Sequence, residues 1–294
     1  YLVCIQTMQY YLQTGFGQAN TGYGGTSSQR SMGLVQGSGG APATWTAVST
    51  ALVDTYKRKG YGASLYARYN KSNLDVAALL YVDDTDLLHK PALPQATEDE
   101  IADYTQRATY YWAKLLQATG GNLKAMKCYW YLLSYKFHKG TATLKSLHEL
   151  PRYTLHIPQQ EGDDVEIELK DNHTATQVLG IWSSPKSTDA QQLKHMIHKG
   201  HNWIRRIQKS TLDTQEIWQS FLTQAIPSVS YGLLTLMSYR QEIDDHFQSW
   251  YYQCLPSLGI TRSISTVWRT LPIEFQGLGL PNMSLNKLAA SLTF

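Results

Sequence analysis

Residues 74–88 read LDVAALLYVDDTDLL, a stretch in which mostly apolar residues flank an acidic centre. Residues 74–82 are nearly all apolar, which is typical of a strand buried on both faces. Aspartates then interrupt the run, and two leucines resume it. This pattern predicts a tight hairpin with carboxylates at its tip. Charges placed between buried strands are costly unless they are paired or bind a cation.

Adjacent aspartates occur at three places in the chain, and two of them serve as comparisons for the third. Asp163-Asp164 precedes an alternating strand pattern and predicts a solvated turn, whereas Asp244-Asp245 lies in a polar helical stretch. Only Asp83-Asp84 has apolar strand on both sides. A carboxylate pair at a hairpin tip is a hard oxygen site of the kind that Mg²⁺ prefers. From the residues alone, a metal site and an ordinary polar turn are equally good interpretations.

The composition favours a globular protein with one large domain or two modest ones. The chain has 294 residues, of which 43% are hydrophobic and 17% charged, and its net charge of +3 neither demands nor excludes a nucleic-acid partner. The three cysteines lie far apart, which disfavours a disulfide framework and a cysteine zinc site, so an intracellular, reducing setting is expected. No run approaches the roughly 18 apolar residues of a membrane span, and no membrane partner is expected.

The order of the elements predicts a mixed α+β part followed by an all-helical part. Residue spacing predicts a helix over 2–13, extended backbone and loop over 15–40, and a second helix that begins at Pro42. A long helix is expected over 98–118. Short strands are expected near 129–137, 153–157, 165–169 and 178–182, and helices near 213–224, 228–237 and 240–254. The boundary between the two parts is therefore expected at residue 184.

The acidic hairpin and a segment before it resemble motifs of reverse transcriptases. Tyr81-Val82-Asp83-Asp84 resembles their Y-x-D-D box. Residues 34–42, LVQGSGGAP, resemble their Q-G-x-x-x-S-P segment, with Ala41 in place of Ser.

Three later segments continue the resemblance in the order that the family has. Residues 120–128, GGNLKAMKC, resemble the glycine-to-lysine segment after the palm helix, although Lys124 stands where Asn is commoner. Leu179-Gly180-Ile181 resembles the primer grip, and residues 276–282, QGLGLPN, resemble the tail after the thumb of LINE-like, non-LTR retroelement enzymes. Each match is weak alone, but five in order from residue 34 to residue 282 form a specific signal.

The resemblance implies an α+β fold with two parts. Residues 1–184 would form a partial polymerase palm, an antiparallel sheet with packed helices, and residues 185–294 an all-α thumb and C-terminal tail. The implied activity is RNA-directed DNA polymerisation, in which two divalent ions polarise the attacking and leaving oxygens. Mg²⁺, or Mn²⁺ in its place, is the implied cofactor. The implied partners are RNA template, DNA primer and dNTPs.

The resemblance also implies roles for individual residues. Asp83 and Asp84 would be the catalytic, metal-binding carboxylates, and Lys127 would protonate the departing pyrophosphate. The nucleotide and template would meet Gln36, Gly37, Ser38, Pro42 and Tyr81, and the primer grip would be Leu179 and Gly180. From the residues alone, Lys127 can equally be a surface lysine after a turn.

One carboxylate of the family's metal site has no counterpart in the chain. In the family, a further aspartate precedes the segment that resembles residues 34–42. Here the first acidic residue of any kind is Asp54, and the chain begins at Tyr1 rather than Met. We therefore expect a fragment that lacks the fingers and the first catalytic strand. Such a fragment is expected to be inactive alone, although its parent is an enzyme.

Basic residues are concentrated between positions 186 and 209, where six lysines and arginines stand against Asp189 alone. The resemblance to a thumb favours contact with the phosphates of a primer–template duplex, whereas a solvated helix face is the better interpretation without it. The residues expected to contact phosphate are Lys194, Lys199, Arg205, Arg206 and Lys209. Three histidines lie among them, at 195, 198 and 201, and are expected to be polar residues without a ligand rather than a metal site.

Aromatic residues follow the Lys127 segment closely, at Tyr129, Trp130, Tyr131, Tyr135 and Phe137. Such a cluster suits base stacking, but packing of core strands is the favoured interpretation.

Two other functions remain open from the sequence. A viral RNA-dependent RNA polymerase shares the palm and the paired Asp, but usually carries Gly where this chain has Val82. A decayed, non-catalytic protein that binds RNA or RNA–DNA duplex is modestly supported by the departures at Ala41 and Lys124.

Overall fold

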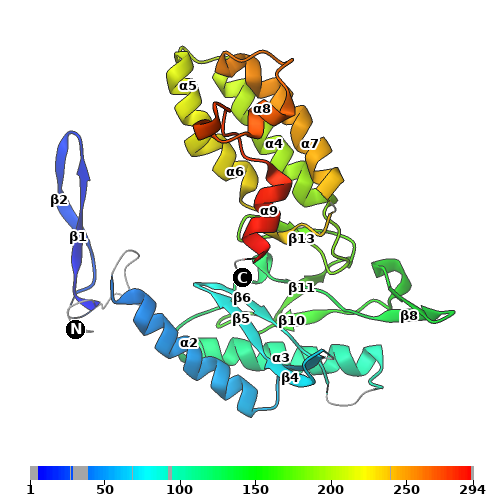
Figure 1. The fold of residues 1–294 in the computed structure, drawn as a ribbon. Helices are drawn as coiled ribbons and strands as arrows, with labels where there is room; N and C mark the ends of the chain where they lie inside the picture. The colour runs from blue at the N-terminus through cyan, green and yellow to red at the C-terminus, as the bar shows by residue number, and fades with distance from the viewer. Residues whose placement is uncertain are drawn as a thin grey trace. The chain divides into compact units, whose positions relative to one another are not determined.

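The computed structural model describes residues 6–26, 28, 39–67, 69–91, 95–238 and 240–292. Contacts divide the chain into two compact units, residues 1–132 with 151–169 and residues 133–150 with 170–294. Small, mostly antiparallel sheets and helices alternate in the first part of the chain, and the described residues after β13 (Ile181–Ser183) form helices and loops (Figure 1). The coarse α+β prediction is therefore confirmed. Strands give way to helices near residue 184, but the contacts group 133–150 and 170–184 with the helical part.

Two helices form the framework of the first unit. The helix α2 (Ala41–Arg58) begins with Pro42 in its first turn, as predicted, and two basic residues in its last turn complement the helix dipole. The helix α3 (Glu98–Ala118) also has the predicted bounds, and it begins with a capping box between Thr97 and Glu100. Their buried side chains form one core: Leu52, Tyr56, Ala108 and Trp112, with Ala77 from the segment between them.

The first unit also contains hairpins and a small sheet. Two hairpins are β3 (Ala63–Ala67) with β4 (Ser72–Val76) and β5 (Ala78–Tyr81) with β6 (Asp84–Leu87). The sheet joins β10 (Leu155–Ile157), β11 (Val165–Leu169) and β7 (Tyr129–Trp130), with β11 and β7 parallel. Gln106 of α3 fastens this sheet by hydrogen bonds to both the amide and the carbonyl of His156.

The helix predicted over 2–13 is wrong for the residues that the structure describes. Residues Gln9–Thr14 form strand β1, which pairs with β2 (Gly17–Gly24) across a short turn. Tyr10, Tyr11 and Thr14 favour strands, and a partner strand lies directly downstream. Local pairing therefore outweighs a weak helical spacing.

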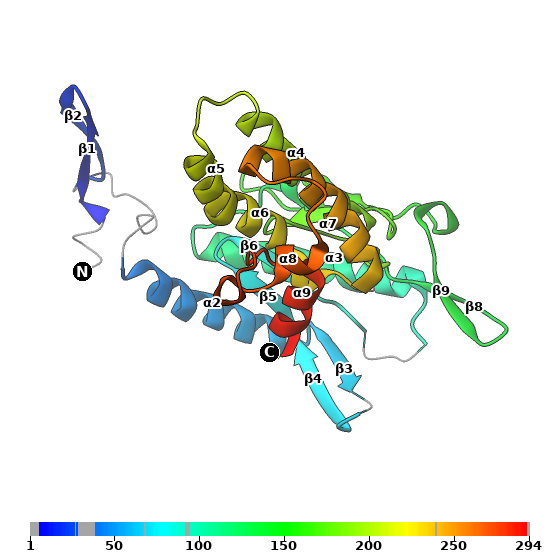
Figure 2. The same ribbon diagram turned by 45° about the horizontal axis from the view of Figure 1, so that its top comes forward.

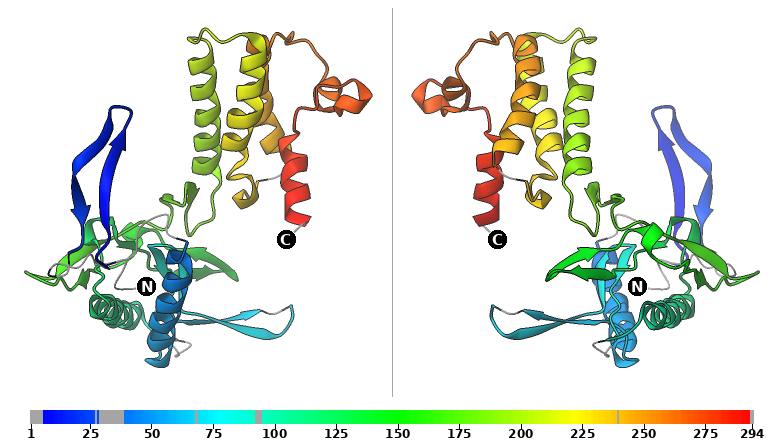
Figure 3. Two further views of the ribbon diagram at one scale, coloured as in Figure 1. Left: turned by 90° about the vertical axis from the view of Figure 1, so that its left-hand side faces the viewer. Right: turned by 90° about the vertical axis from the view of Figure 1, so that its right-hand side faces the viewer.

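The second unit combines two hairpins with a bundle of helices. The hairpins are β8 (Tyr135–His138) with β9 (Thr141–Leu144) and β12 (Thr176–Val178) with β13. The helices are α4 (Ala190–Ile207), α5 (Thr214–Ser220), α6 (Ile226–Ser230), α7 (Arg240–Cys254), α8 (Thr266–Thr270) and α9 (Met283–Leu292). Several of them run side by side in Figure 3. Their core includes Trp203, Phe221 and Trp250.

The predicted helices after residue 210 are right in part. Residues 240–254 are helical as predicted. The predicted helix over 213–224 continues without a break to Ser230 through a π-helical segment, Phe221–Ala225. Pro227 lacks an amide hydrogen and crowds the preceding turn, which accounts for the wider turn. The helix predicted over 228–237 is wrong, because the helical run ends at Ser230.

Helices α4 and α7 approach closely at Gly200. A Cβ atom at this position would lie 2.4 Å from Nε1 of Trp250, so any larger residue would displace the indole. The buried side of α4 includes Leu193, Met196 and Trp203, which leaves its basic residues on the other sides. None of the helices in the described ranges is long and apolar enough to cross a bilayer.

Candidate functional site

The acidic hairpin forms as predicted, with a two-residue turn at its tip. Tyr81 pairs with Asp84 across β5 and β6, which leaves Val82 and Asp83 as the turn. Val82 has φ of 56°, while Asp83 is not among the residues with positive φ. Positive φ at the first turn residue only is the pattern of a type II′ turn, where glycine is preferred. A β-branched residue is strained in this conformation, so the surrounding structure holds the tip in place.

The inner face of the hairpin anchors it to the first unit. Leu80 and Leu87 pack against the core of α2 and α3, and the amide of Leu88 donates to the carbonyl of Ala77 at 3.0 Å. The hairpin lies beside these helices in Figures 1 and 2. The prediction of burial on both faces is wrong, because the side chains of Leu79 and Tyr81 are 59% and 62% exposed. Two strands covered on one side leave an open outer face.

Three carboxylates lie at the tip or on this outer face. Asp83 and Asp84 are exposed, and neither carboxylate has a hydrogen bond or ion pair within the described ranges. Asp84 and Asp86 lie opposite Tyr81 and Leu79, so the four side chains share the outer face. Burial, and then the negative charge of Asp84, raises the pKa of Asp86. Asp86 was not predicted as a site residue, although its i, i+2 spacing from Asp84 on a strand places both side chains on one face.

The donor set suits a hard divalent cation in part. Mg²⁺ is commonly bound through one or two carboxylates together with water and substrate phosphates. Asp83 and Asp84 supply two unpaired carboxylates of this kind. No group of three or more His, Cys, Asp or Glu side chains that could hold a metal is found in the described residues. The chain's own carboxylates therefore fit an open, substrate-completed site rather than a closed one.

The other residues predicted for this site lie elsewhere or outside the described ranges. Gln36, Gly37 and Ser38 fall among residues 29–38, which the structure does not describe. Pro42 is exposed in the first turn of α2. Lys127 ends a short 3₁₀ turn, Ala125–Lys127, and its exposed ammonium forms no ion pair with Asp83 or Asp84. Its role in proton transfer stays a prediction.

The predicted primer grip is a second strained turn, in the other unit. Leu179 and Gly180 join β12 to β13, and both have positive φ, 51° and 82°, as in a type I′ turn. The hydroxyl of Tyr231 donates to the carbonyl of Leu179 at 2.8 Å. The ammonium of Lys199 lies 5.9 Å from the centre of the Tyr231 ring, within cation–π range. Tyr231, absent from the sequence predictions, thus connects the turn with the basic helix.

Helix α4 carries four of the five predicted basic residues on its outer sides, and the fifth, Lys209, lies just after its end. Lys194, Arg205, Arg206 and Lys209 are exposed, and Lys199 is half-buried. Helical geometry places Lys194 and Arg205 in one stripe, with His198 and His201 between them, and Arg206 to one side. The pKa of the half-buried His195 is lowered by burial first, and then by the charges of Lys199 and His198. The arrangement presents positive charge to solvent, which suits contact with phosphates.

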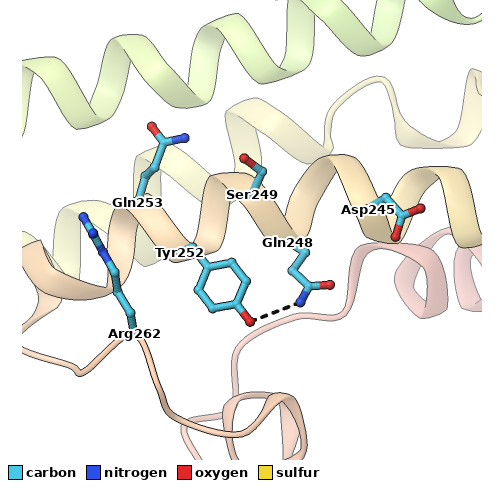
Figure 4. A pocket seen from close by; sticks show the side chains of 6 residues that line it. All are labelled: Asp245, Gln248, Ser249, Tyr252, Gln253 and Arg262. Carbon is cyan, nitrogen blue, oxygen red and sulfur yellow. Dashed lines mark hydrogen bonds between the residues drawn. The ribbon is translucent and has the colours of Figure 1, made fainter.

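Among its described residues, the second unit includes two surface hollows whose lining contains no predicted site residue. One of about 440 Å³ lies along α7, where the amide of Gln248 donates to the hydroxyl of Tyr252 (Figure 4). Its other lining residues are Asp245, Ser249, Gln253 and Arg262. The second, of about 520 Å³, is lined by Lys136, Ser146, Glu149 and Asp171 among others.

Comparisons with known proteins found no matching family model, no matching curated protein and no matching solved structure.

Proposed function

We propose that this chain is the palm-and-thumb part of a LINE-like reverse transcriptase, an RNA-directed DNA polymerase. The order of five sequence motifs suggests the family. The hairpin β5–β6 would be the part of the palm that binds the catalytic metal ions. Helix α4 would belong to the thumb and contact the primer–template duplex. An RNA template, a DNA primer and dNTPs are the proposed partners.

The observation that carries the proposal is the tip of the hairpin. Asp83 and Asp84 are exposed and unpaired within the described residues, at a strained turn that Leu80 and Leu87 anchor to the core. Such a rigid pair positions charge before a ligand arrives, so little ordering is needed on binding. A divalent ion, when bound, neutralises and polarises phosphate oxygens. In this proposal Asp83 is the principal ligand and Asp84 assists.

Titration with Mn²⁺, followed by electron paramagnetic resonance, tests the metal site. We expect Asp83→Asn to weaken Mn²⁺ binding about tenfold or more, because the open site has few protein ligands. Addition of dTTP should tighten binding to the wild-type chain, since triphosphate oxygens complete the coordination. Asp163→Asn is the matched control, because Asp163-Asp164 is also an exposed pair of adjacent aspartates. Equal losses in the two variants would contradict a specific site at the hairpin.

A non-catalytic duplex-binding protein is the second candidate. It is supported by the departures from the family's motifs at Ala41 and Lys124. Helix α4 would still present its basic residues to a duplex. Binding of an RNA–DNA hybrid without Mn²⁺ binding at Asp83 would support this candidate over the polymerase.

A further inference from the structure

The hairpin β8–β9 presents aromatic side chains to solvent. Phe137 is 78% exposed and Tyr135 is 51% exposed. The expectation that both pack in the core is therefore wrong, whereas Trp130, at 8% exposed, is buried as expected. The hairpin extends from the rest of its unit in Figures 1 and 2. We refer to residues 135–144 as the aromatic hairpin.

Strand register separates the aromatic and basic side chains. Tyr135 pairs with Leu144 and Phe137 with Ala142, so these four side chains share one face. Lys136 pairs with Thr143 and His138 with Thr141 on the opposite face. Tyr135 and Phe137 are two residues apart, which corresponds to about 7 Å along a strand. Each ring can therefore receive a separate flat ligand.

The charge of this hairpin is entirely positive. Residues 134–145 contain three lysines and one histidine and no acidic residue. Lys136 forms an ion pair with Glu149. The hydrogen bond that the Lys136 ammonium donates in this pair is the main cause that lowers the pKa of Glu149 to about 2. Lys139 at the tip has no hydrogen bond or ion pair within the described ranges. The tip charge is therefore available to an anionic ligand.

The backbone at the tip holds Lys139 in an unusual conformation. Lys139 and Gly140 have φ of 47° and 80°, the pattern of a type I′ turn. Asn, Asp or Gly is preferred at the first of these positions, because a longer side chain is strained there. A lysine at this position lowers the local stability of the turn, and it places an ammonium group at the end of the hairpin. Strained conformations of this kind are frequent where a ligand is bound.

We infer that the aromatic hairpin binds a single strand of nucleic acid. Bases stack on the rings of Phe137 and Tyr135, and the ammonium of Lys139 contacts the phosphates. Aromatic side chains combined with basic ones are the common means of binding single strands without sequence preference. A duplex is a poorer ligand, because its bases are stacked on one another and their faces are covered. The binding needs no metal, so it is independent of the carboxylates of β5–β6.

Fluorescence anisotropy with labelled twelve-nucleotide strands of rU and of dT tests the inference on the whole chain, in EDTA. Phe137→Ala is expected to weaken binding by about fivefold to a hundredfold, and Phe137→Trp to retain it. Phe275→Ala is the matched control, because Phe275 is 68% exposed in the same unit. Preference for rU would indicate contact with the 2′-hydroxyl, and equal binding would indicate stacking alone. Both results support the inference if Phe137→Ala reduces the affinity.

Photocrosslinking locates the contact independently of affinity. A 5-bromouridine strand is expected to crosslink to a peptide that contains Tyr135 or Phe137. Crosslinks only elsewhere, or equal affinity of wild-type and Phe137→Ala chains, would overturn the inference. If the chain dimerises and Phe137→Ala abolishes the dimer without changing strand binding, this face binds a second copy of the chain. That result would also overturn the inference. Because EDTA removes divalent ions, the absence of strand binding in this assay would not affect the metal-binding proposal. Likewise, the absence of Mn²⁺ binding would not affect the proposal that the aromatic hairpin binds a single strand.

Discussion

Single residues in unfavourable conformations occupy three of the hairpin turns. Val82, Leu179 and Lys139 all have positive φ, although none is a residue that tolerates it well. Each stands in a two-residue hairpin turn, next to residues with an inferred function. Sequence alone gave no sign of this strain, because a Y-V-D-D or H-K-G-T segment does not state its dihedral angles. The strain becomes evident only from the backbone dihedral angles of the folded chain.

Replacement of Val82 by glycine tests whether the tip is strained. Glycine adopts positive φ without steric cost, so Val82→Gly is expected to raise the free energy of unfolding by about 0.5–1 kcal/mol. Because the tip would also become less rigid, Mn²⁺ affinity should fall. Urea denaturation measures the first effect. Val165→Gly is the control: Val165 is a partly exposed strand valine without positive φ, and its replacement should destabilise by about 1 kcal/mol. Equal destabilisation by both substitutions would contradict the strained turn.

His89 makes the first unit sensitive to acid. It forms a hydrogen bond with the hydroxyl of the fully buried Tyr56, and burial lowers the pKa of His89 to about 4. The unfolded chain has a histidine pKa near 6.5, so between pH 6.5 and pH 4 it binds more protons than the folded chain. The stabilisation from neutral His89 is thus complete above pH 6.5 and is lost as the pH falls towards 4.

Urea denaturation at pH 7 and pH 4.5 measures this effect. We expect the wild type to lose about 2–3 kcal/mol more stability on acidification than His89→Gln, which keeps hydrogen-bonding capacity without titrating. His138→Gln, at an exposed position, should behave as the wild type. An identical loss in wild type and His89→Gln would show that His89 is not the acid-sensitive group.

At the scale of elements, prediction succeeded where the signal was local. Helix α3 has a capping box at its start and glycines after its end, and both bounds were predicted. The hairpin β5–β6 was predicted from aspartates between apolar runs. The exposure of Leu79 was not, because it depends on how many strands share the sheet. Strand β1 was mistaken for a helix because its partner, β2, is glycine-rich and carries no strand pattern of its own.

Side-chain contacts between elements that are distant in the chain could not be predicted from the sequence. Tyr231 meets the Leu179–Gly180 turn only because α6 and the β12–β13 turn come together in the folded unit. Gly200 could be recognised as part of an apolar stripe, but its contact with Trp250 of α7 depends on helix packing. Residues 29–38, which hold three predicted site residues, lie outside the described ranges. Their role stays a prediction.

Helix α4 is expected to dominate the salt dependence of duplex binding. Arg205→Gln should reduce the slope of log affinity against log salt by about one, and the double substitution with Arg206→Gln by about two, since each removes one phosphate contact. Titrations of an RNA–DNA hybrid at several salt concentrations measure the slope. Arg152→Gln is the control, because Arg152 is an exposed arginine outside α4. Slopes that do not differ between these variants would remove α4 from the proposed interface.

At the scale of the whole molecule, the net charge of +3 conceals an uneven distribution. Basic residues gather on α4 and on the aromatic hairpin, whereas unpaired carboxylates stand at the tip of β5–β6. In the proposed polymerase, the carboxylates of β5–β6 would bind cations and the basic residues would bind phosphates, so both groups must remain available to their ligands. The carboxylates would then serve nucleotide addition, and the basic residues would hold the nucleic-acid strands.

Iron-directed cleavage tests most directly whether a metal ion bound at the proposed site on β5–β6 lies at a primer terminus. Fe²⁺ replaces Mg²⁺ in the chain bound to an end-labelled DNA primer on an RNA template, and ascorbate with peroxide then generates hydroxyl radicals at the metal. We predict cuts clustered at the last nucleotides of the primer 3′ end, lost in Asp83→Asn and retained in Asp163→Asn. Cuts spread evenly along the primer, or unchanged in Asp83→Asn, would contradict the assignment of this chain to an RNA-directed DNA polymerase.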